Sequence, residues 1–251
     1  MTMIKSFLAS LGMFTKIKVK DNVFEDSRGA AILTFFPADG LICGAVTSCC
    51  LWALRYFEVR EALSGALLTL SLFLISGFLH LDGFMDCSDA LLSSRDMEGK
   101  RRILKDSNVG AFAVICVSLL LIVTAPSLGA VYSSELPWWA VAVVPFFSRA
   151  LFSVVLFTFR PMEDNKGLLY YFNSGKKLLH TASVAIQCVI ALAGSYFVSP
   201  VLFFSLAGAG AIALAAAKIA EKLLGGINGD VIGGGVILTE AACYLMLALF
   251  L

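Results

Sequence analysis

Three aspartates lie close together in the segment LHLDGFMDCSD, residues 79–89: Asp82, Asp86 and Asp89. In a helix their i, i+4, i+7 spacing places them within an arc of roughly 60°. Like charges on one face repel each other, and they repel more strongly near a membrane because the dielectric constant falls there. The segment contains no basic residue. We therefore predict that all three carboxylates bind a divalent cation, and oxygen ligands at this density favour Mg²⁺ or Mn²⁺.

Two other interpretations of the acidic segment remain open. The aspartates could end a helix in solvated headgroups, which is the ordinary explanation for a single acid, or they could line an ion or proton pathway. His80 at the start of the segment is expected to make a structural hydrogen bond, and Cys87 to pack away from the acidic face.

The segment RDMEGKRRILKD, residues 95–106, follows the acids and is rich in cations. Arg102 and Lys105 are candidates for holding phosphate, although basic residues next to a span are also expected for topological reasons. Asp106 and Ser107 are candidates for substrate binding, and they could cap the next helix, whose N-terminus would favour an anion.

A glycine-rich segment, GGINGDVIGGG, occupies residues 225–235. Glycines let the backbone approach a phosphate closely, and Asn228 and Asp230 would add polar contacts. Helix packing in a membrane is the alternative explanation for these glycines. Glu240, farther along, is expected to face the protein interior because a lipid-facing acid is costly.

The composition is that of an integral membrane protein. Of the 251 residues, 59% are hydrophobic and 15% are charged, and the mean hydropathy is +0.88. The seven cysteines show neither zinc spacing nor a secreted disulfide framework, and the net charge of +1 argues against a nucleic-acid partner. Crossing a bilayer takes about 20 mainly apolar residues per helix. Windows of this kind predict one all-α domain, residues 1–251, with about seven transmembrane helices at 29–54, 62–80, 109–131, 138–158, 181–198, 201–217 and 232–251.

Basic residues divide unevenly between the predicted connections. The N-terminal segment and residues 80–108, 159–180 and 218–231 together hold 16 of the 19 Lys and Arg residues, and the opposite connections hold only Arg55 and Arg60. Positive residues favour the cytoplasmic side. We therefore expect a multi-pass protein of the cytoplasmic (inner) cell membrane with a cytoplasmic N-terminus and all of these polar motifs facing the cytoplasm.

Taken together, the motifs resemble those of the cobalamin synthase family, the adenosylcobinamide-GDP ribazoletransferases. The resemblance covers nearly the whole chain and rests on SRG at 27–29, FP at 36–37, HLDGFMDCSD at 80–89, KDSNVG at 105–110, SR at 148–149 and GGINGD at 225–230 followed by Glu240.

The resemblance implies an enzyme of the final steps of cobalamin biosynthesis. It would join adenosylcobinamide-GDP to α-ribazole or its 5'-phosphate, release GMP and depend on Mg²⁺. Asp82, Asp86 and Asp89 would hold the metal, and one of them would orient or deprotonate the acceptor hydroxyl. Phosphate oxygens would be held by the candidates Arg28, Arg102, Lys105 and Arg149. Arg149 stands out because a cation inside a span needs a partner. A homo-oligomer and an association with other cobalamin-pathway enzymes both stay open.

Two other functions compete with this one. A membrane phosphotransferase of the CDP-alcohol type also carries helically spaced aspartates around a DG pair, but it normally has AR after the DG and a longer acid spacing, which are absent here. An ion-coupled transporter would use the aspartates in its pathway, and an internal repeat would favour it, but the sequence shows no convincing repeat.

Overall fold

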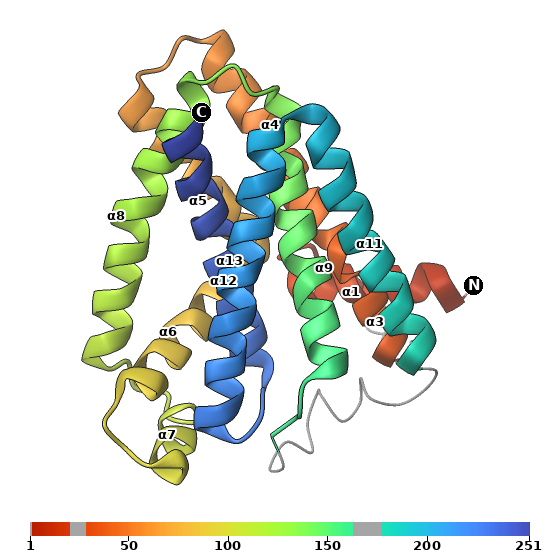
Figure 1. Ribbon diagram of the computed structural model, residues 1–251, viewed down its shortest axis with the longest axis vertical. Coiled ribbons are helices and arrows are strands. Elements are labelled where there is room, and N and C mark those ends of the chain that lie inside the picture. The colour runs from red at the N-terminus through yellow and green to blue at the C-terminus, as the bar shows by residue number, and fades with distance from the viewer. Residues whose placement is uncertain (1, 21–28, 163–176) are drawn as a thin grey trace.

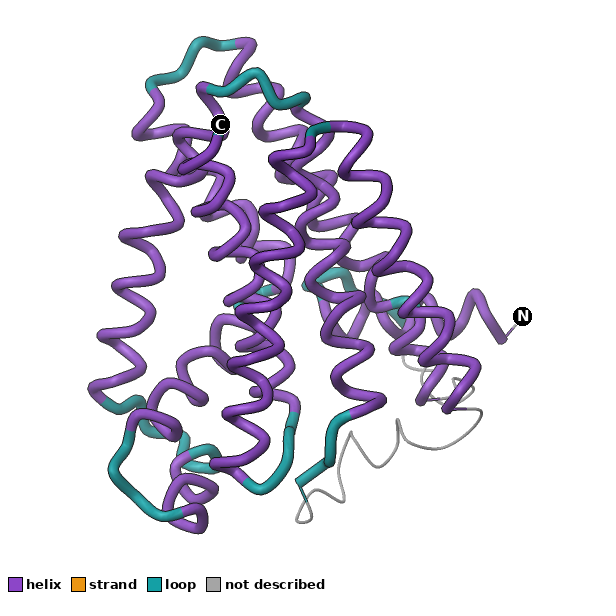
Figure 2. Tube along the Cα trace, in the orientation of Figure 1, coloured by secondary structure: helices purple, strands orange, loops and turns teal. Residues whose placement is uncertain are grey.

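The computed structural model describes residues 2–20, 29–162 and 177–251, and these residues fold almost entirely into helices (Figure 2). The helices are α1 (Thr2–Phe14), α3 (Gly29–Thr34), α4 (Phe36–Tyr56), α5 (Glu61–Ser76), α6 (Leu79–Leu92), α7 (Met97–Ile103), α8 (Ala111–Ser133), the 3₁₀ helix η1 (Trp138–Ala142), α9 (Val143–Thr158), α11 (Lys177–Val198), α12 (Pro200–Leu224) and α13 (Gly229–Phe250). The prediction of an all-α membrane bundle is confirmed.

Six of the helical segments in the described residues are long and apolar enough to cross a membrane: Gly29–Tyr56, Ala111–Ser133, Trp138–Thr158, Leu178–Val198, Pro200–Leu224 and Gly229–Phe250. The predicted first span is broken only at Phe35, between α3 and α4, and Pro37 sits in the first turn of α4, where a missing N–H costs nothing. A seventh span results if α5 and α6 are counted together.

The predicted second span, 62–80, is wrong at its C-terminal end. The helix stops at Ser76, and α6 turns away from α5 by 96°. Gly77 and Phe78 both adopt left-handed backbone angles, with φ of 62° and 63°, and this conformation cannot continue a right-handed helix. The 16 residues of α5 reach only about 24 Å, which is less than the apolar thickness of a bilayer.

This bend places α6, which carries the three aspartates, at an angle inside one half of the bundle (Figure 1). The loop that contains α7, the segment after α9 and the turn between α12 and α13 gather at this same end (Figure 1). Backbone hydrogen bonds from Met162 to Ile227 and from Ile227 to Arg160 join two of these connections, at 3.0 and 2.9 Å. The polar motifs of 80–110 and 225–230 therefore share one end of the bundle, as the distribution of basic residues predicts.

At the opposite end, Arg55 closes the C-terminus of α8. Its guanidinium donates to the carbonyl oxygens of Val131, Tyr132, Ser134 and Leu136, all at 2.8–2.9 Å. Helix C-termini leave carbonyls without intrahelical partners, and a cation there also complements the helix dipole. One of the two basic residues on the sparsely charged side thus has a structural role.

The buried apolar side chains form two clusters. One contains Phe152, Val231 and Val236 near the end that carries the polar motifs, and the other contains Phe147, Ile237 and Tyr244 toward the opposite end. On α9 and α13, Arg149 and Glu240 lie next to members of the second cluster, Ala150 and Ala241.

Candidate active site

Helix α6 packs directly against the N-terminal half of α13. A methyl group added at Gly83 would lie 2.9 Å from the Cα and carbonyl oxygen of Asp230, so only glycine allows the helices to come this close. His80, one turn before Gly83, faces Gly233, and Phe84, next to Gly83, faces Gly234. A Cβ on either glycine of α13 would lie 3.2 Å from the facing Cα. Small residues at such contacts let membrane helices approach each other closely. The two glycine-containing motifs are therefore the two halves of one helix contact.

This contact brings Asp230 to the aspartates of α6. The charges of Asp230, Asp82 and Asp89 act on the carboxylate of Asp86, and that of Asp82 acts on Asp230. Asp82 is exposed, and Asp86 and Asp230 are half-buried. Within the described residues no basic side chain forms an ion pair with Asp82, Asp86 or Asp230. Three carboxylates from two helices thus share a region of negative potential that is open to solvent at Asp82.

Asn228 holds the start of α13 in place. Its side-chain oxygen accepts a hydrogen bond from the backbone N–H of Val231 at 3.0 Å, which is the usual N-cap contact, and its amide donates to Asp230 Oδ2 at 2.6 Å. The substrate contact predicted for Asn228 stays a prediction, because the structure shows the side chain orienting Asp230.

Asp89 has a different environment from Asp82 and Asp86. It is buried, its Oδ2 accepts from the N–H of Gly110 at 2.7 Å, and its Oδ1 accepts from the N–H of Ala113 at 2.9 Å. The Asp89 carboxylate therefore caps the N-terminus of α8, although Gly110 lies 21 residues later in the chain.

The capping role predicted for Asp106 and Ser107 is wrong. Helix α8 begins at Ala111, after Gly110, and that N-cap residue has no side chain to bond the first turn. Asp106 lies too early in the chain and instead accepts hydrogen bonds from the backbone and side-chain amides of Asn108, at 3.0 and 2.7 Å. These two bonds lower the pKa of the exposed Asp106 carboxyl.

The basic residues in and just after α7 divide into two groups: some bond the C-termini of neighbouring helices, and the others are exposed. Lys100 is buried and donates from Nζ to the carbonyl oxygens of Ala90, Leu91 and Ser93 at the C-terminus of α6. Arg101 donates from Nε to the carbonyl oxygen of Leu224 at the end of α12, at 2.6 Å. The predicted phosphate ligands Arg102 and Lys105 are instead exposed, and they line a surface groove of about 620 Å³ together with Asp96, Met97, Glu98 and Arg101.

A family model described as cobalamin-5-phosphate synthase matches residues 6–248 of the chain. The chain belongs to this family. The cobalamin-5-phosphate synthase assignment agrees with the curated relatives. A protein of Clostridium perfringens (strain 13 / Type A) named adenosylcobinamide-GDP ribazoletransferase is 35% identical over 246 residues and covers 98% of both chains. Proteins of the same name from Clostridium botulinum (strain Alaska E43 / Type E3) and Brevibacillus brevis (strain 47 / JCM 6285 / NBRC 100599) are 33% and 30% identical, covering 99% and 97% of this chain and 98% of each relative. No solved structure matches the chain.

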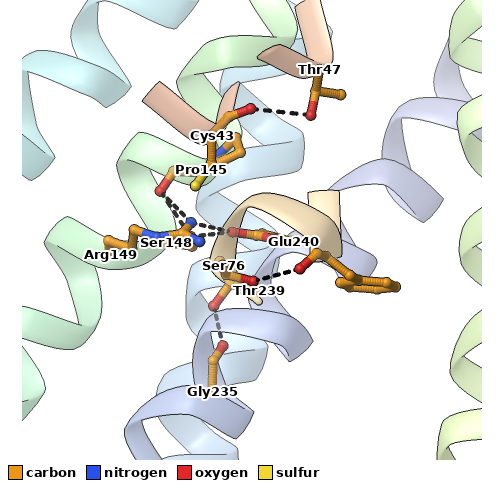
Figure 3. A network of polar contacts seen from close by, with 10 residues as sticks. Cys43, Thr47, Ser76, Pro145, Ser148, Arg149, Gly235, Thr239 and Glu240 are labelled. Atoms are coloured by element: carbon orange, nitrogen blue, oxygen red, sulfur yellow. Dashed lines mark hydrogen bonds and ion pairs between the residues drawn. The ribbon is translucent and has the colours of Figure 1, made fainter. Parts of the chain in front are cut away.

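The Arg149 side chain of this synthase-family bundle is buried, with 2% exposure, and bonds Glu240 (Figure 3). The expectations that Arg149 needs a partner and that Glu240 faces the interior are both confirmed. The phosphate contact predicted for Arg149 does not follow from this geometry, because reaching a substrate would require the pair to separate. Arg28, another predicted phosphate ligand, lies outside the described residues.

The carboxylates of α6 and α13 suit a metal ion that is bound by the protein and the substrate together. In the described part of the chain no three His, Cys, Asp or Glu side chains form a group that could hold a metal ion. Mg²⁺ commonly uses one or two carboxylates and completes its octahedron with water and substrate phosphates. Asp82, Asp86 and Asp230, which share negative charge without a basic partner among the described residues, fit that kind of site.

Lys16 lies beside the candidate site, and the sequence pattern does not single it out. It follows α1, its N–H bonds the carbonyl oxygen of Ile75 at 3.0 Å, and its side chain lies over Gly77 at the break between α5 and α6. Lys16 and Asp82 both line a largely polar pocket of about 370 Å³ at this break. In the sequence Lys16 is one of several N-terminal basic residues and contributes only to the topology argument, so only the bend of α6 distinguishes it.

Proposed function

We propose that this protein transfers the adenosylcobinamide phosphate group from adenosylcobinamide-GDP to α-ribazole or its 5'-phosphate, with release of GMP, as a Mg²⁺-dependent enzyme. The relatives named adenosylcobinamide-GDP ribazoletransferase support the substrate class. The observation that carries the chemistry is the close packing of α6, which bears Asp82 and Asp86, against the backbone of Asp230 on α13, with Asp82 exposed to solvent.

In the proposed reaction the hydroxyl oxygen of the acceptor forms a bond to the phosphorus that bears the cobinamide group. The bond from that phosphorus to the bridging oxygen breaks, and GMP leaves with this oxygen. The hydroxyl proton passes to an aspartate carboxylate of the cluster. Phosphoryl transfer depends mainly on positioning and on stabilising negative charge, so the acids need a cation. Bound Mg²⁺ would supply this charge neutralisation on the diphosphate oxygens.

The surrounding residues have separate roles in this proposal. One or two of Asp82, Asp86 and Asp230 would hold the cation together with substrate phosphate, and Asn228 keeps Asp230 in orientation through the 2.6 Å bond. Arg102 and Lys105 attract the phosphates of the donor from the exposed groove at the same end of the bundle.

We also propose that this end of the bundle faces the cytoplasm and that the N-terminus is cytoplasmic, in the cytoplasmic membrane. The support is the excess of Lys and Arg on the connections that gather there. The phosphate-bearing donor and the polar acceptor would then reach the acids without crossing the bilayer.

The deciding experiment supplies membranes that contain the protein with adenosylcobinamide-GDP, α-ribazole and Mg²⁺, and measures GMP. We expect GMP to form only when both substrates are present and to stop when EDTA is added. Turnover that persists in EDTA would contradict the metal requirement. Turnover of a CDP-alcohol pair instead of the cobinamide pair would contradict the substrate assignment.

A further inference from the structure

Asp89 connects the acid-bearing helix to the N-terminus of α8. Its two carboxylate oxygens accept separate backbone hydrogen bonds, from Gly110 at 2.7 Å and from Ala113 at 2.9 Å, and only 9% of the residue is exposed. Free backbone N–H groups and the positive end of the helix dipole meet at this position, so a negative side chain is favoured there. The structure therefore gives the charge of Asp89 a partner inside the protein.

Residue 110 has no room for a side chain beside the Asp89 carboxylate. A Cβ at residue 110 would lie 2.5 Å from Asp89 Oδ1 and 2.7 Å from its Cγ, so any side chain at residue 110 would push the carboxylate away. The backbone of Gly110 has φ −89° and ψ 173°, which every residue can adopt. Space for the Asp89 carboxylate, and not backbone conformation, thus requires glycine at the end of the KDSNVG segment.

A second contact holds the same end of α6. Lys100 Nζ bonds the carbonyl oxygens of Ala90, Leu91 and Ser93, the residues that immediately follow Asp89. The connection between α6 and α8 is therefore anchored near both of its ends, at Lys100 and at Gly110. Arg102 and Lys105 lie on the stretch between the two anchors, and Asp86 lies one helical turn before Asp89.

We propose that Asp89 is a positioning residue that clamps the N-terminus of α8 through its contact with Gly110. This contact fixes Asp86 relative to Asp230. It also fixes the groove lined by Arg102 and Lys105 relative to these two acids. The proposal rests on the proposed function and refines it, because it removes Asp89 from the metal ligands predicted from helical spacing. A clamp acts through the two backbone contacts, whereas a ligand or base acts through its own carboxylate. Perturbing Gly110 separates these roles, because that change displaces the clamp without altering any acid.

The test compares Asp89→Ala, Asp89→Asn, Gly110→Ala and the double variant Asp89→Asn/Gly110→Ala in GMP release. We expect Asp89→Asn and Gly110→Ala each to lower the rate about tenfold, which corresponds to about 1.4 kcal/mol of activation free energy. The rate of the double variant should lie within about twofold of the rate of the slower single variant, because both changes break the same contact. Asp89→Asn, which keeps one accepting oxygen, should be faster than Asp89→Ala. The Mg²⁺ concentration for half-maximal rate should rise to a similar extent in Asp89→Asn and Gly110→Ala, because both changes move Asp86 relative to Asp230, whereas loss of a direct ligand would raise it only in the Asp89 variants.

Gly194→Ala on α11 is the matched control, since a Cβ there meets nothing within 4 Å. It should leave the rate unchanged. Loss of all turnover in Asp89→Asn together with a wild-type rate in Gly110→Ala would overturn the proposal, because the carboxylate would then act directly. Wild-type rates in both would overturn it as well.

Hydrogen–deuterium exchange of the peptide covering residues 106–116 gives a readout that needs no substrate. We expect faster exchange at residues 110–113 in Asp89→Ala and Gly110→Ala than in wild type, and unchanged exchange in Gly194→Ala. Unchanged exchange in the first two variants would show that the clamp does not exist. If wild-type protein has no ribazoletransferase activity but the exchange result holds, the proposed function fails while the contact stands.

Discussion

Arg149 on α9 and Glu240 on α13 form a buried ion pair, with 2.7 Å between Nη1 of the guanidinium and Oε1 of the carboxylate (Figure 3). Ser148 donates to the same carboxylate oxygen at 2.8 Å, and Arg149 also donates to the carbonyl oxygen of Pro145 at 3.1 Å. The pair is almost fully buried, with the two side chains 2% and 5% exposed. It therefore fixes α13, which carries Asp230 near its start, to the centre of the bundle.

Removing one partner of this pair should destabilise the protein strongly. Arg149→Met and Glu240→Leu should each cost about 3–5 kcal/mol, because the remaining charge would stay buried without its ion-pair partner. The double variant Arg149→Met/Glu240→Leu should recover most of this loss, since apolar side chains suit the site. The unfolding midpoint of purified protein in detergent measures the effect. Single variants as stable as wild type, or a double variant no better than the singles, would contradict the structural role of the pair.

Neutralising the acids of the cluster should stop catalysis without unfolding the protein. Asp82→Asn, Asp86→Asn and Asp230→Asn should each lower GMP release at saturating Mg²⁺ by at least about 100-fold, because a charged ligand or proton acceptor is lost. Glu135→Gln, at an exposed acid on the opposite end of the bundle, is the control and should be unaffected. Full turnover in Asp82→Asn or Asp86→Asn would remove that residue from the metal site.

Charge in the groove beside α7 should affect donor binding more than the chemical step. Arg102→Gln and Lys105→Gln should each raise the KM for adenosylcobinamide-GDP about tenfold with little change in kcat, because a charge-assisted contact to phosphate contributes about 1.5–3 kcal/mol. Steady-state kinetics at two salt concentrations measure this, and the wild-type KM should rise with salt. Arg60→Gln, an exposed cation at the other end, should leave KM unchanged. A fall in kcat alone would place these cations at the reacting phosphorus.

The orientation in the membrane is testable by cysteine labelling. In a variant without native cysteines, a cysteine at residue 98 or 170 should react with a membrane-impermeant maleimide only in inside-out vesicles, and Glu135→Cys only in intact cells. Residue 170 lies outside the described residues, so this site tests the charge distribution alone. Labelling of residue 98 in intact cells would reverse the proposed topology.

Much of the architecture follows from the sequence because its causes are local. Runs of apolar residues of bilayer length predict the helices, since backbone polar groups in lipid must be satisfied within a helix. The i, i+4, i+7 spacing places Asp82 and Asp86 on one face of a helix, and the residues of α6 do form that helix. The grouping of Lys and Arg predicts which connections share an end, because each connection between two spans is short and stays on one side of the membrane.

Only the tertiary structure decides which of these residues meet. The bend at Phe78 is not readable from the sequence, because a bulky residue rarely adopts a left-handed conformation and does so here within a packed bundle. Asp230 joins Asp82 and Asp86 because Gly83 lets α13 pack against α6, a contact between segments far apart in the chain. The same packing points Asp89 to Gly110 and Arg149 to Glu240. Helical spacing specifies a face of one helix, and the partner of that face depends on how all the helices pack.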